Sequence, residues 1–367
     1  MSHVYVHVPF CARRCSYCDF AIAVRRSVPS AEYLEAVTRE AETAVGREPI
    51  ATLYFGGGTP SLLDTGAFAD LIRRLTALAP LAPGAEVTIE ANPEDVTAAS
   101  ARAWRAAGVN RVSLGAQSFD DRVLRWMHRI HDAERTRDAV RALRDAGFDD
   151  LSLDLIFAVP PELGRDFSAD LDAAVALSPD HLSLYGLTVE ERTPLARWIS
   201  RGESHPPDDD RYAAEYLEAH RRLAAAGYRF YEVSNAARDG RRSRHNSAYW
   251  TGASYAGLGP AAHSFDGATR RWNHREWERY RRAIVAGESP VESVEALTGE
   301  QAALERAYLD LRTDRGISRS ILPAVQLSTW LAQDWVEARG DRVVCRPEGW
   351  LRLDALVSAL TAPPAAR

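Results

Sequence analysis

Short runs of apolar and β-branched residues alternate, over the first half of the chain, with segments whose apolar residues recur at helical spacing. The runs that predict strands cover residues 4–8, 52–55, 87–90, 111–114, 151–157 and 181–187. The segments that predict helices cover residues 32–45, 67–78, 98–107, 133–146 and 167–177. Gly108 and Gly147 stand where two of these helices should end. Because strands that alternate with helices are typical of βα units, and six units are too few for a closed eight-fold barrel, we predict a partial (β/α)6 barrel of the TIM type with a parallel sheet.

The second half of the chain has a weaker pattern. We expect the barrel domain to cover residues 1–235, a connecting region to cover residues 236–290, and a small, mainly helical domain to cover residues 291–367. The last part contains Cys345, for which we expect a structural role, and a tail, residues 361–367, that we expect to be disordered. No helix in this part carries the clustered basic residues of a DNA-reading helix, so we expect no nucleic-acid partner.

The composition is that of an ordinary globular protein. The chain has 367 residues, of which 46% are hydrophobic and 26% charged, and a net charge of −6. A protein with a negative net charge does not attract nucleic acid through its overall electrostatic field. No apolar run reaches the roughly 20 residues that span a bilayer, and the N-terminus lacks the apolar segment of an export signal. We therefore expect a cytoplasmic protein.

Three cysteines crowd a short loop after the first predicted strand. Cys11, Cys15 and Cys18 have the spacing C-x3-C-x2-C. Three thiols are an odd number, and structural disulfides are rare in the cytosol. A structural zinc ion takes four ligands, and the fourth would have to be a histidine such as His3 or His7. Three thiolates can instead hold three irons of a four-iron cluster and leave the fourth iron open, and the set favours this interpretation.

Further candidate groups follow the other predicted strands. The turn Gly56-Gly57-Gly58-Thr59-Pro60 follows the second strand, Glu90 ends the third, Gln117 follows the fourth and Asp154 lies within the fifth. A glycine triplet is often only a tight turn, and a polar residue at a strand end is often structural. Groups at the C-terminal ends of successive strands, however, meet at one mouth of a barrel.

This set of groups suits a ligand with an amino-acid part and a nucleoside part. Glycines let the backbone approach a ligand closely, Glu90 could accept a hydrogen bond from an ammonium group, and Arg129 could pair with a carboxylate. Gln117 and Asp154 could hold ribose hydroxyls. A ligand of this kind beside an open iron is S-adenosylmethionine (SAM).

The cysteine loop, with Tyr17 before its last cysteine, resembles the signature of the radical SAM superfamily. The run Tyr5-Val6-His7-Val8-Pro9-Phe10-Cys11, the Gly-Gly-Gly-Thr-Pro turn and residues 88–93, 111–119 and 152–157 resemble its HemN/HemW branch. The resemblance covers nearly the whole chain. Residues 305–317 and 349–360 resemble the small, winged-helix-like C-terminal domain of that branch.

The resemblance implies roles for individual residues. Cys11, Cys15 and Cys18 would ligate a [4Fe-4S] cluster, whose fourth iron SAM would chelate. The SAM contacts that it implies are Tyr5, Tyr17, Gly57, Gly58, Thr59, Glu90, Gln117, Arg129 and Asp154. A reductant such as flavodoxin or ferredoxin is implied as a partner. One departure is His128, which stands where sequences of the HemW type often have glycine.

Three observations distinguish among the members of the branch. The coproporphyrinogen dehydrogenase carries a further cysteine where this chain has Phe20, and it has a segment ahead of the cysteine loop, which here begins close to Met1. The run from His245 to Trp250 has the pattern H-N-x-x-Y-W, which resembles HemW. His245 is the candidate heme ligand, His263 competes with it, and the motif could also only pin a loop to the barrel.

The resemblance therefore implies a heme chaperone of the HemW type, which binds a cluster, SAM and heme and passes the heme to an acceptor protein, for example a respiratory one. Contact with a membrane would be at most peripheral, through that acceptor. Two alternatives stay open: an oxygen-independent coproporphyrinogen III dehydrogenase and a radical SAM methyltransferase. Whether the protein is an enzyme stays open with them, although the three observations favour the chaperone over the dehydrogenase.

Overall fold

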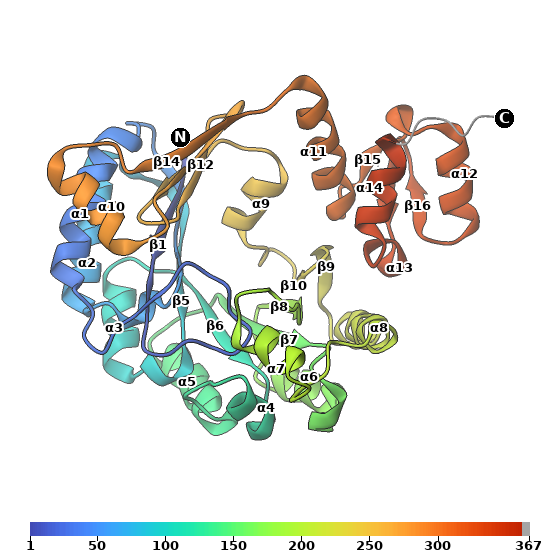
Figure 1. Ribbon diagram of the computed structural model, residues 1–367, viewed down its shortest axis with the longest axis horizontal. Helices are drawn as coiled ribbons and strands as arrows, with labels where there is room; N and C mark the ends of the chain where they lie inside the picture. The colour runs from blue at the N-terminus through green and yellow to red at the C-terminus, as the bar shows by residue number, and fades with distance from the viewer. Residues whose placement is uncertain (362–367) are drawn as a thin grey trace.

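The computed structural model describes residues 1–361 and has a curved sheet of nine strands at its centre (Figure 1). The strands are β1 (His3–Val8), β4 (Ile50–Gly57), β5 (Leu81–Ala91), β6 (Arg111–Gln117), β7 (Leu151–Phe157), β8 (His181–Gly186), β9 (Arg229–Glu232), β10 (Asn235–Ala237) and β11 (Ala256–Leu258). Their order is β11-β1-β4-β5-β6-β7-β8-β10-β9, parallel from β11 to β8 and antiparallel at β10 and β9. All six predicted strands are present, and the predicted partial barrel is confirmed.

The predicted helices cover the outer face of this sheet (Figure 1). They are α1 (Ser30–Ala44), α2 (Thr65–Leu78), α3 (Ala98–Ala106), α5 (Ala133–Asp145) and α6 (Phe167–Ala176). The side chains of Asp64 and Asp132 accept hydrogen bonds from backbone N–H groups in the first turns of α2 and α5. Gly108 and Gly147 follow α3 and α5 with φ values of 101° and 84°, the left-handed conformation that ends a helix and that glycine adopts easily.

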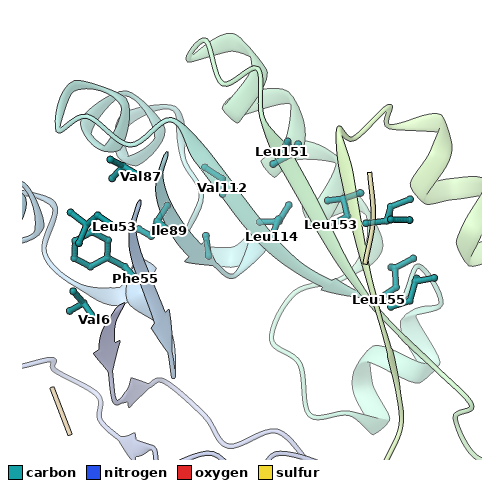
Figure 2. Packing of buried hydrophobic residues seen from close by; sticks show 14 of the residues in the cluster. Val6, Leu53, Phe55, Val87, Ile89, Val112, Leu114, Leu151, Leu153 and Leu155 are labelled. Atoms are coloured by element: carbon teal, nitrogen blue, oxygen red, sulfur yellow. The ribbon is translucent and has the colours of Figure 1, made fainter. Parts of the chain in front are cut away.

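The core lies between the sheet and these helices (Figure 2). Buried residues from successive strands form it: Val6, Leu53, Phe55, Val87, Ile89, Val112, Leu114, Leu151, Leu153 and Leu155. Because alternate residues of a strand point to opposite faces, their neighbours Tyr5, Tyr54, Glu90 and Asp154 point to the inner face of the barrel. The apolar residues of each strand therefore face the helices, and the polar residues face the inside of the barrel.

Shorter elements connect these units. Strands β2 (Phe10–Cys11) and β3 (Ala23–Val24) pair within the cysteine loop. Helices α4 (Asp121–Trp126), α7 (Pro194–Ser200) and α8 (Asp209–Ala225) follow β6 and β8, and short 3₁₀ helices cover Pro60–Leu62, Pro93–Asp95, Pro161–Leu163 and Arg319–Ile321. Beyond the barrel come α9 (Arg244–Trp250), β12 (His263–Phe265), β13 (Thr269–Asn273), α10 (Trp277–Ala286) and β14 (Val291–Ala296). Strands β12, β13 and β14 form an antiparallel sheet of their own.

The C-terminal part lies at the end of the molecule away from α1 (Figure 1). It comprises α11 (Gly299–Arg312), β15 (Ile317–Ser318), α12 (Ala324–Ala332), β16 (Val336–Arg339), β17 (Arg342–Cys345), α13 (Pro347–Trp350) and α14 (Leu353–Thr361). Its three strands pair in the order β15-β17-β16, and Cys345 is buried in its core, as expected of a structural cysteine. Helices that flank a small sheet agree with the winged-helix-like domain that the sequence predicts.

The predicted boundary at residue 235 falls at the start of β10, and β11, from residues 236–290, pairs with β1. The connecting region therefore completes one edge of the sheet, and the division into three parts stays a prediction. The predicted tail, residues 361–367, lies almost wholly outside the described residues. Among the helices of residues 1–361, none is long and apolar enough to cross a bilayer.

Candidate functional site

A cavity of about 570 Å³ opens at the C-terminal ends of the parallel strands. Most of the predicted site residues line it: Cys11, Cys15, Tyr17, Cys18, Gly57, Gly58, Thr59, Glu90, Gln117, Arg129 and Asp154. Its volume is typical of ligand sites, which measure about 300–1,000 Å³. Among the predicted cluster and SAM residues, Tyr5 is the exception, because it lines a separate cavity. The structure thus brings together nearly all of the groups that the sequence places at strand ends.

Backbone pairing holds the cysteine loop in place. Strand β2 pairs with β3, so that the N–H of Ala23 donates to Pro9 O at 2.7 Å and the N–H of Arg25 to Cys11 O at 2.9 Å. The N–H of Ser16 donates to Met127 O at 3.1 Å, which ties the loop to the end of α4. These backbone hydrogen bonds connect both ends of the loop to neighbouring segments.

The thiols suit a cluster better than a single zinc ion. All three are free, and they border one cavity. The histidines that could complete a zinc site have other partners, since His3 lies 2.9 Å from Thr52 Oγ1 and His7 lies 3.1 Å from Tyr5 Oη.

Burial raises the pKa of two thiols in the loop, Cys11 and Cys18. It raises the pKa of Cys11 to about 11, although the Thr59 hydroxyl donates a hydrogen bond to Cys11 Sγ at 3.3 Å. Burial also raises the pKa of Cys18. Because metal ligation requires thiolates, binding of a cluster here would release protons.

Arg129 connects the cysteine loop with β5 and β6. Its Nη2 donates to Asn92 Oδ1 at 2.5 Å and to Gly115 O at 3.0 Å, and its Nη1 lies 3.6 Å from Cys15 Sγ. Its Nε is buried without a hydrogen-bond partner in residues 1–361. An unpaired buried donor on the wall of a cavity fits a ligand with an acceptor group.

The residue before Arg129 shows why a glycine suits this position. His128 has a φ of 60°, in the left-handed region that glycine adopts without strain. Its ring packs edge-on against Trp198, with the ring centroids 5.1 Å apart. The departure from the family pattern therefore keeps the backbone conformation and leaves the contacts of Arg129 in place.

Glu90 and Gly57 form a second polar centre on the wall of the cavity. The Glu90 carboxylate accepts hydrogen bonds from Tyr54 Oη at 2.7 Å and from the N–H of Gly57 at 3.1 Å. Burial raises the pKa of Glu90 to about 7, and the charge of Asp154 adds to the effect. Gly57 has a φ of 110°, and a Cβ there would lie only 2.7 Å from the ring of His7.

Asp154 lies across the cavity, within β7. Its two carboxylate oxygens accept hydrogen bonds from Ser113 Oγ at 3.0 and 3.1 Å. Burial raises its pKa, and the hydrogen bonds from Ser183 and Ser113 act in the opposite direction. Glu90, Asp154 and Arg129 therefore bring carboxylates and a guanidinium to one cavity, which Asp19, Glu190 and Arg13 also line, and this combination suits a ligand carrying both ammonium and carboxylate groups.

The H-N-x-x-Y-W motif lies on α9, not in a loop. His245 has only 1% of its surface exposed. Its Nδ1 lies 2.7 Å from Thr52 Oγ1, its Nε2 lies 2.8 Å from Tyr249 Oη, and its ring stacks on that of Tyr54 with centroids 4.9 Å apart. Both ring nitrogens are engaged, so iron ligation by His245 would require one of these hydrogen bonds to break.

The comparisons with known proteins agree with this geometry. The radical SAM superfamily matches residues 5–174. The heme chaperone HemW of Mycobacterium tuberculosis (strain H37Rv) is 40% identical over an alignment of 366 residues that covers 97% of this chain and 94% of that protein. HemW of Bacillus subtilis is 33% identical over 325 residues, or 87% and 85% of the two chains. The chain belongs to the HemN/HemW branch of the radical SAM superfamily.

The structure of the branch member HemN, a coproporphyrinogen III oxidase from Escherichia coli, has the same fold. Its TM-score is 0.82 over 97% of this chain and 89% of HemN, at 23% sequence identity. Membership of the radical SAM superfamily implies a [4Fe-4S] cluster and SAM. Such a cluster supplies an electron for the cleavage of SAM, and the large cavity has the thiols and the charged groups to hold both.

Two neighbours of the predicted residues lie at the site although the sequence analysis assigned them no role. Tyr54 donates to Glu90, and Asn92 accepts from Arg129. Strand alternation could have indicated Tyr54, because it follows the buried Leu53 and precedes the buried Phe55. Asn92 lies two residues after Glu90, but its partner Arg129, which follows α4, could not be inferred from the local sequence.

Proposed function

We propose that this protein is a heme chaperone of the HemW type, which holds a [4Fe-4S] cluster and SAM, binds heme and transfers it to an acceptor protein. The observation that carries the proposal is the identity of 33–40% to proteins named heme chaperone HemW over 87–97% of this chain. Phe20 supports it, because it lines the large cavity where the dehydrogenase of this branch has a further cysteine.

Within this proposal, the residues of the large cavity have distinct tasks. Cys11, Cys15 and Cys18 hold the cluster. Nine residues contact SAM: Tyr5, Tyr17, Gly57, Gly58, Thr59, Glu90, Gln117, Arg129 and Asp154. Most of them line the same cavity as the cysteines, whereas Tyr5 lines a separate cavity and would act through His7, which packs against Gly57.

The partners follow from the same proposal. The heme passes to an acceptor protein, for example a respiratory one, with at most peripheral contact with a membrane. A reductant such as flavodoxin or ferredoxin supplies the electron, and the protein acts in the cytoplasm without a nucleic-acid partner. The net charge of −6 and the absence of a spanning helix in residues 1–361 are compatible with this.

Heme binding and coproporphyrinogen turnover distinguish the chaperone from the dehydrogenase. We expect the anaerobically reconstituted protein to produce a Soret band that saturates at micromolar heme. With SAM, a reductant and coproporphyrinogen III, it should release no protoporphyrinogen IX. Substantial decarboxylation would contradict the chaperone proposal and favour the dehydrogenase. S-adenosylhomocysteine formed together with 5′-deoxyadenosine would favour a methyltransferase.

The pKa of Glu90 makes SAM binding depend on pH. Because burial raises this pKa to about 7, the carboxyl group is protonated in slightly acidic solution and cannot accept a hydrogen bond from the amino group of SAM as a carboxylate does. Binding favours the ionised form, so SAM affinity should rise with pH, by up to about tenfold per unit below the pKa, and level off above it. Calorimetric titration between about pH 6 and about pH 8 measures this.

The control is Glu90→Gln, which keeps the shape of the side chain and removes its ionisation. Its SAM affinity should be lower than that of the unaltered protein at the higher pH and nearly independent of pH. If the SAM affinity of this variant depends on pH as steeply as that of the unaltered protein, another group causes the dependence. The first candidate is Asp154, a carboxylate on the cavity wall whose charge acts on Glu90.

A further inference from the structure

A second cavity, of about 400 Å³, lies beside the edge of the sheet formed by β1 and β11. Aromatic side chains make up much of its wall, among them Tyr249, Tyr255 and Phe265. The rings of Tyr249 and Tyr255 meet edge-on at 4.6 Å, and those of Tyr255 and Phe265 lie 6.5 Å apart. Such a wall suits a flat, apolar ligand, since aromatic side chains bury a large area and keep polar atoms at their edges.

The cavity also contains a histidine with free nitrogen atoms. His263 lies on β12, opposite Trp272 of β13, and the two rings stack with centroids 5.6 Å apart. The side chain of His263 is exposed to the cavity, and neither ring nitrogen has a hydrogen-bond partner among residues 1–361. Partial burial, and then the nearby charge of Arg270, lower the pKa of His263, so its ring is neutral and has a lone pair for a metal.

The other histidines near this cavity are engaged. His245 contacts Thr52 and Tyr249 through its two ring nitrogens, and His7 contacts Tyr5 at 3.1 Å and Ala21 O at 3.4 Å. His245 Nε2 lies 2.8 Å from the hydroxyl of Tyr249, and this hydrogen bond fixes the orientation of Tyr249 in the cavity wall. The H-N-x-x-Y-W motif therefore shapes the second cavity through Tyr249 and Trp250, while its histidine remains outside the wall.

We propose that the second cavity is the heme site and that His263 is the protein ligand of the heme iron, with His245 as a positioning residue for Tyr249. This inference rests on the proposed function, because it deepens heme binding. The neutral ring of His263 donates a nitrogen lone pair to the iron, and Trp272 holds the plane of that ring. Arg270 lines the same cavity, is paired with Glu305, and would be the cation that meets a heme carboxylate.

The two cavities meet at His7. The ring of His7 lines the second cavity and packs against Gly57, which lines the first. Heme in the second cavity and SAM in the first would therefore both lie next to this side chain. This arrangement offers a direct path by which occupancy of one site changes the other.

Heme titration of single variants tests the assignment. In His263→Ala we expect the Soret maximum to shift and the apparent Kd for heme to rise on the order of tenfold or more. Added imidazole should restore the spectrum of the unaltered protein, and His263→Cys should produce a thiolate-type spectrum. The matched control is His205→Ala, which removes a surface histidine with 73% of its side chain exposed and should leave both spectrum and affinity unchanged.

Tyr249→Phe tests the positioning role. It removes the hydroxyl partner of His245 and keeps the ring, so it should weaken heme binding without a change in the Soret maximum. A Soret maximum and an affinity unchanged in His263→Ala would overturn the assignment of His263 while heme binding stands. If His245→Ala loses the histidine-ligated spectrum and His263→Ala keeps it, the heme ligand is His245 and the assignment of His263 is wrong. An unaltered protein that binds no heme would refute the proposed function itself.

Discussion

Replacement of any one of Cys11, Cys15 or Cys18 by serine should abolish the iron–sulfur cluster. Each thiolate would hold one iron, and a serine hydroxyl is a much poorer ligand for such a cluster than a thiolate. After anaerobic reconstitution, we expect the iron content to fall from about four atoms per chain to almost none. Iron and sulfide analysis, visible absorption and the electron paramagnetic resonance signal of the reduced protein measure this loss.

The matched control is Cys345→Ala. Cys345 is buried in the C-terminal part, far along the chain from the cluster loop, so this variant should retain the full iron content. Pairing between β2 and β3 is made by backbone groups and not by the thiols, so the cluster-free serine variants should unfold at nearly the same temperature as the metal-free parent protein. A single serine variant that keeps four irons would show that another residue serves as ligand. One tightly bound zinc ion per chain would instead favour the zinc interpretation of this loop.

The parts of the fold that depend on local pattern could be predicted from the sequence. Strands β1 and β4–β8 and their helices follow from short apolar runs and helical spacing, because alternate strand residues must face the core. The cysteine loop could be predicted because all of its ligands lie within eight residues, from Cys11 to Cys18. Polar residues at strand ends could be assigned to one mouth because parallel strands end at the same edge of a barrel.

The parts that depend on contacts between distant segments could not be predicted. Strand β11 joins β1 across about 250 residues of chain, Val4 opposite Ala256, and nothing in either short run specifies that pairing. His245 appeared available in the sequence because the chain around it is polar, but α9 packs against β4 and buries its ring against Tyr54. Tyr5 lines a second cavity whose walls, apart from Tyr5 and His7, come from residues beyond 248, so the position of Tyr5 could only be seen in the folded chain.

Gly57→Ala should damage both cavities at once. Its φ of 110° lies in a region where an L-residue is strained, at a cost of about 1–2 kcal/mol in the free energy of unfolding. The new Cβ would also lie 2.7–2.9 Å from three atoms of the His7 ring, so that ring must move. Movement of His7 breaks its 3.1 Å contact with Tyr5, and a shift of residue 57 weakens the hydrogen bond of its N–H to Glu90. We expect SAM affinity to fall on the order of tenfold or more.

Gly84→Ala separates backbone strain from this contact. Gly84 also has a positive φ, of 68°, but a Cβ there would meet no atom within 4 Å. Denaturant unfolding should therefore show a smaller loss of stability in Gly84→Ala, and calorimetric titration of the cluster-loaded protein should show unchanged SAM affinity. If both variants lose the same stability and both bind SAM normally, the packing of His7 against Gly57 has no part in SAM binding. Another outcome is that only Gly57→Ala has a lower affinity for SAM and that this variant also binds heme more weakly. The side chain of His7 then couples the two cavities, because His7 is the group that the new methyl displaces.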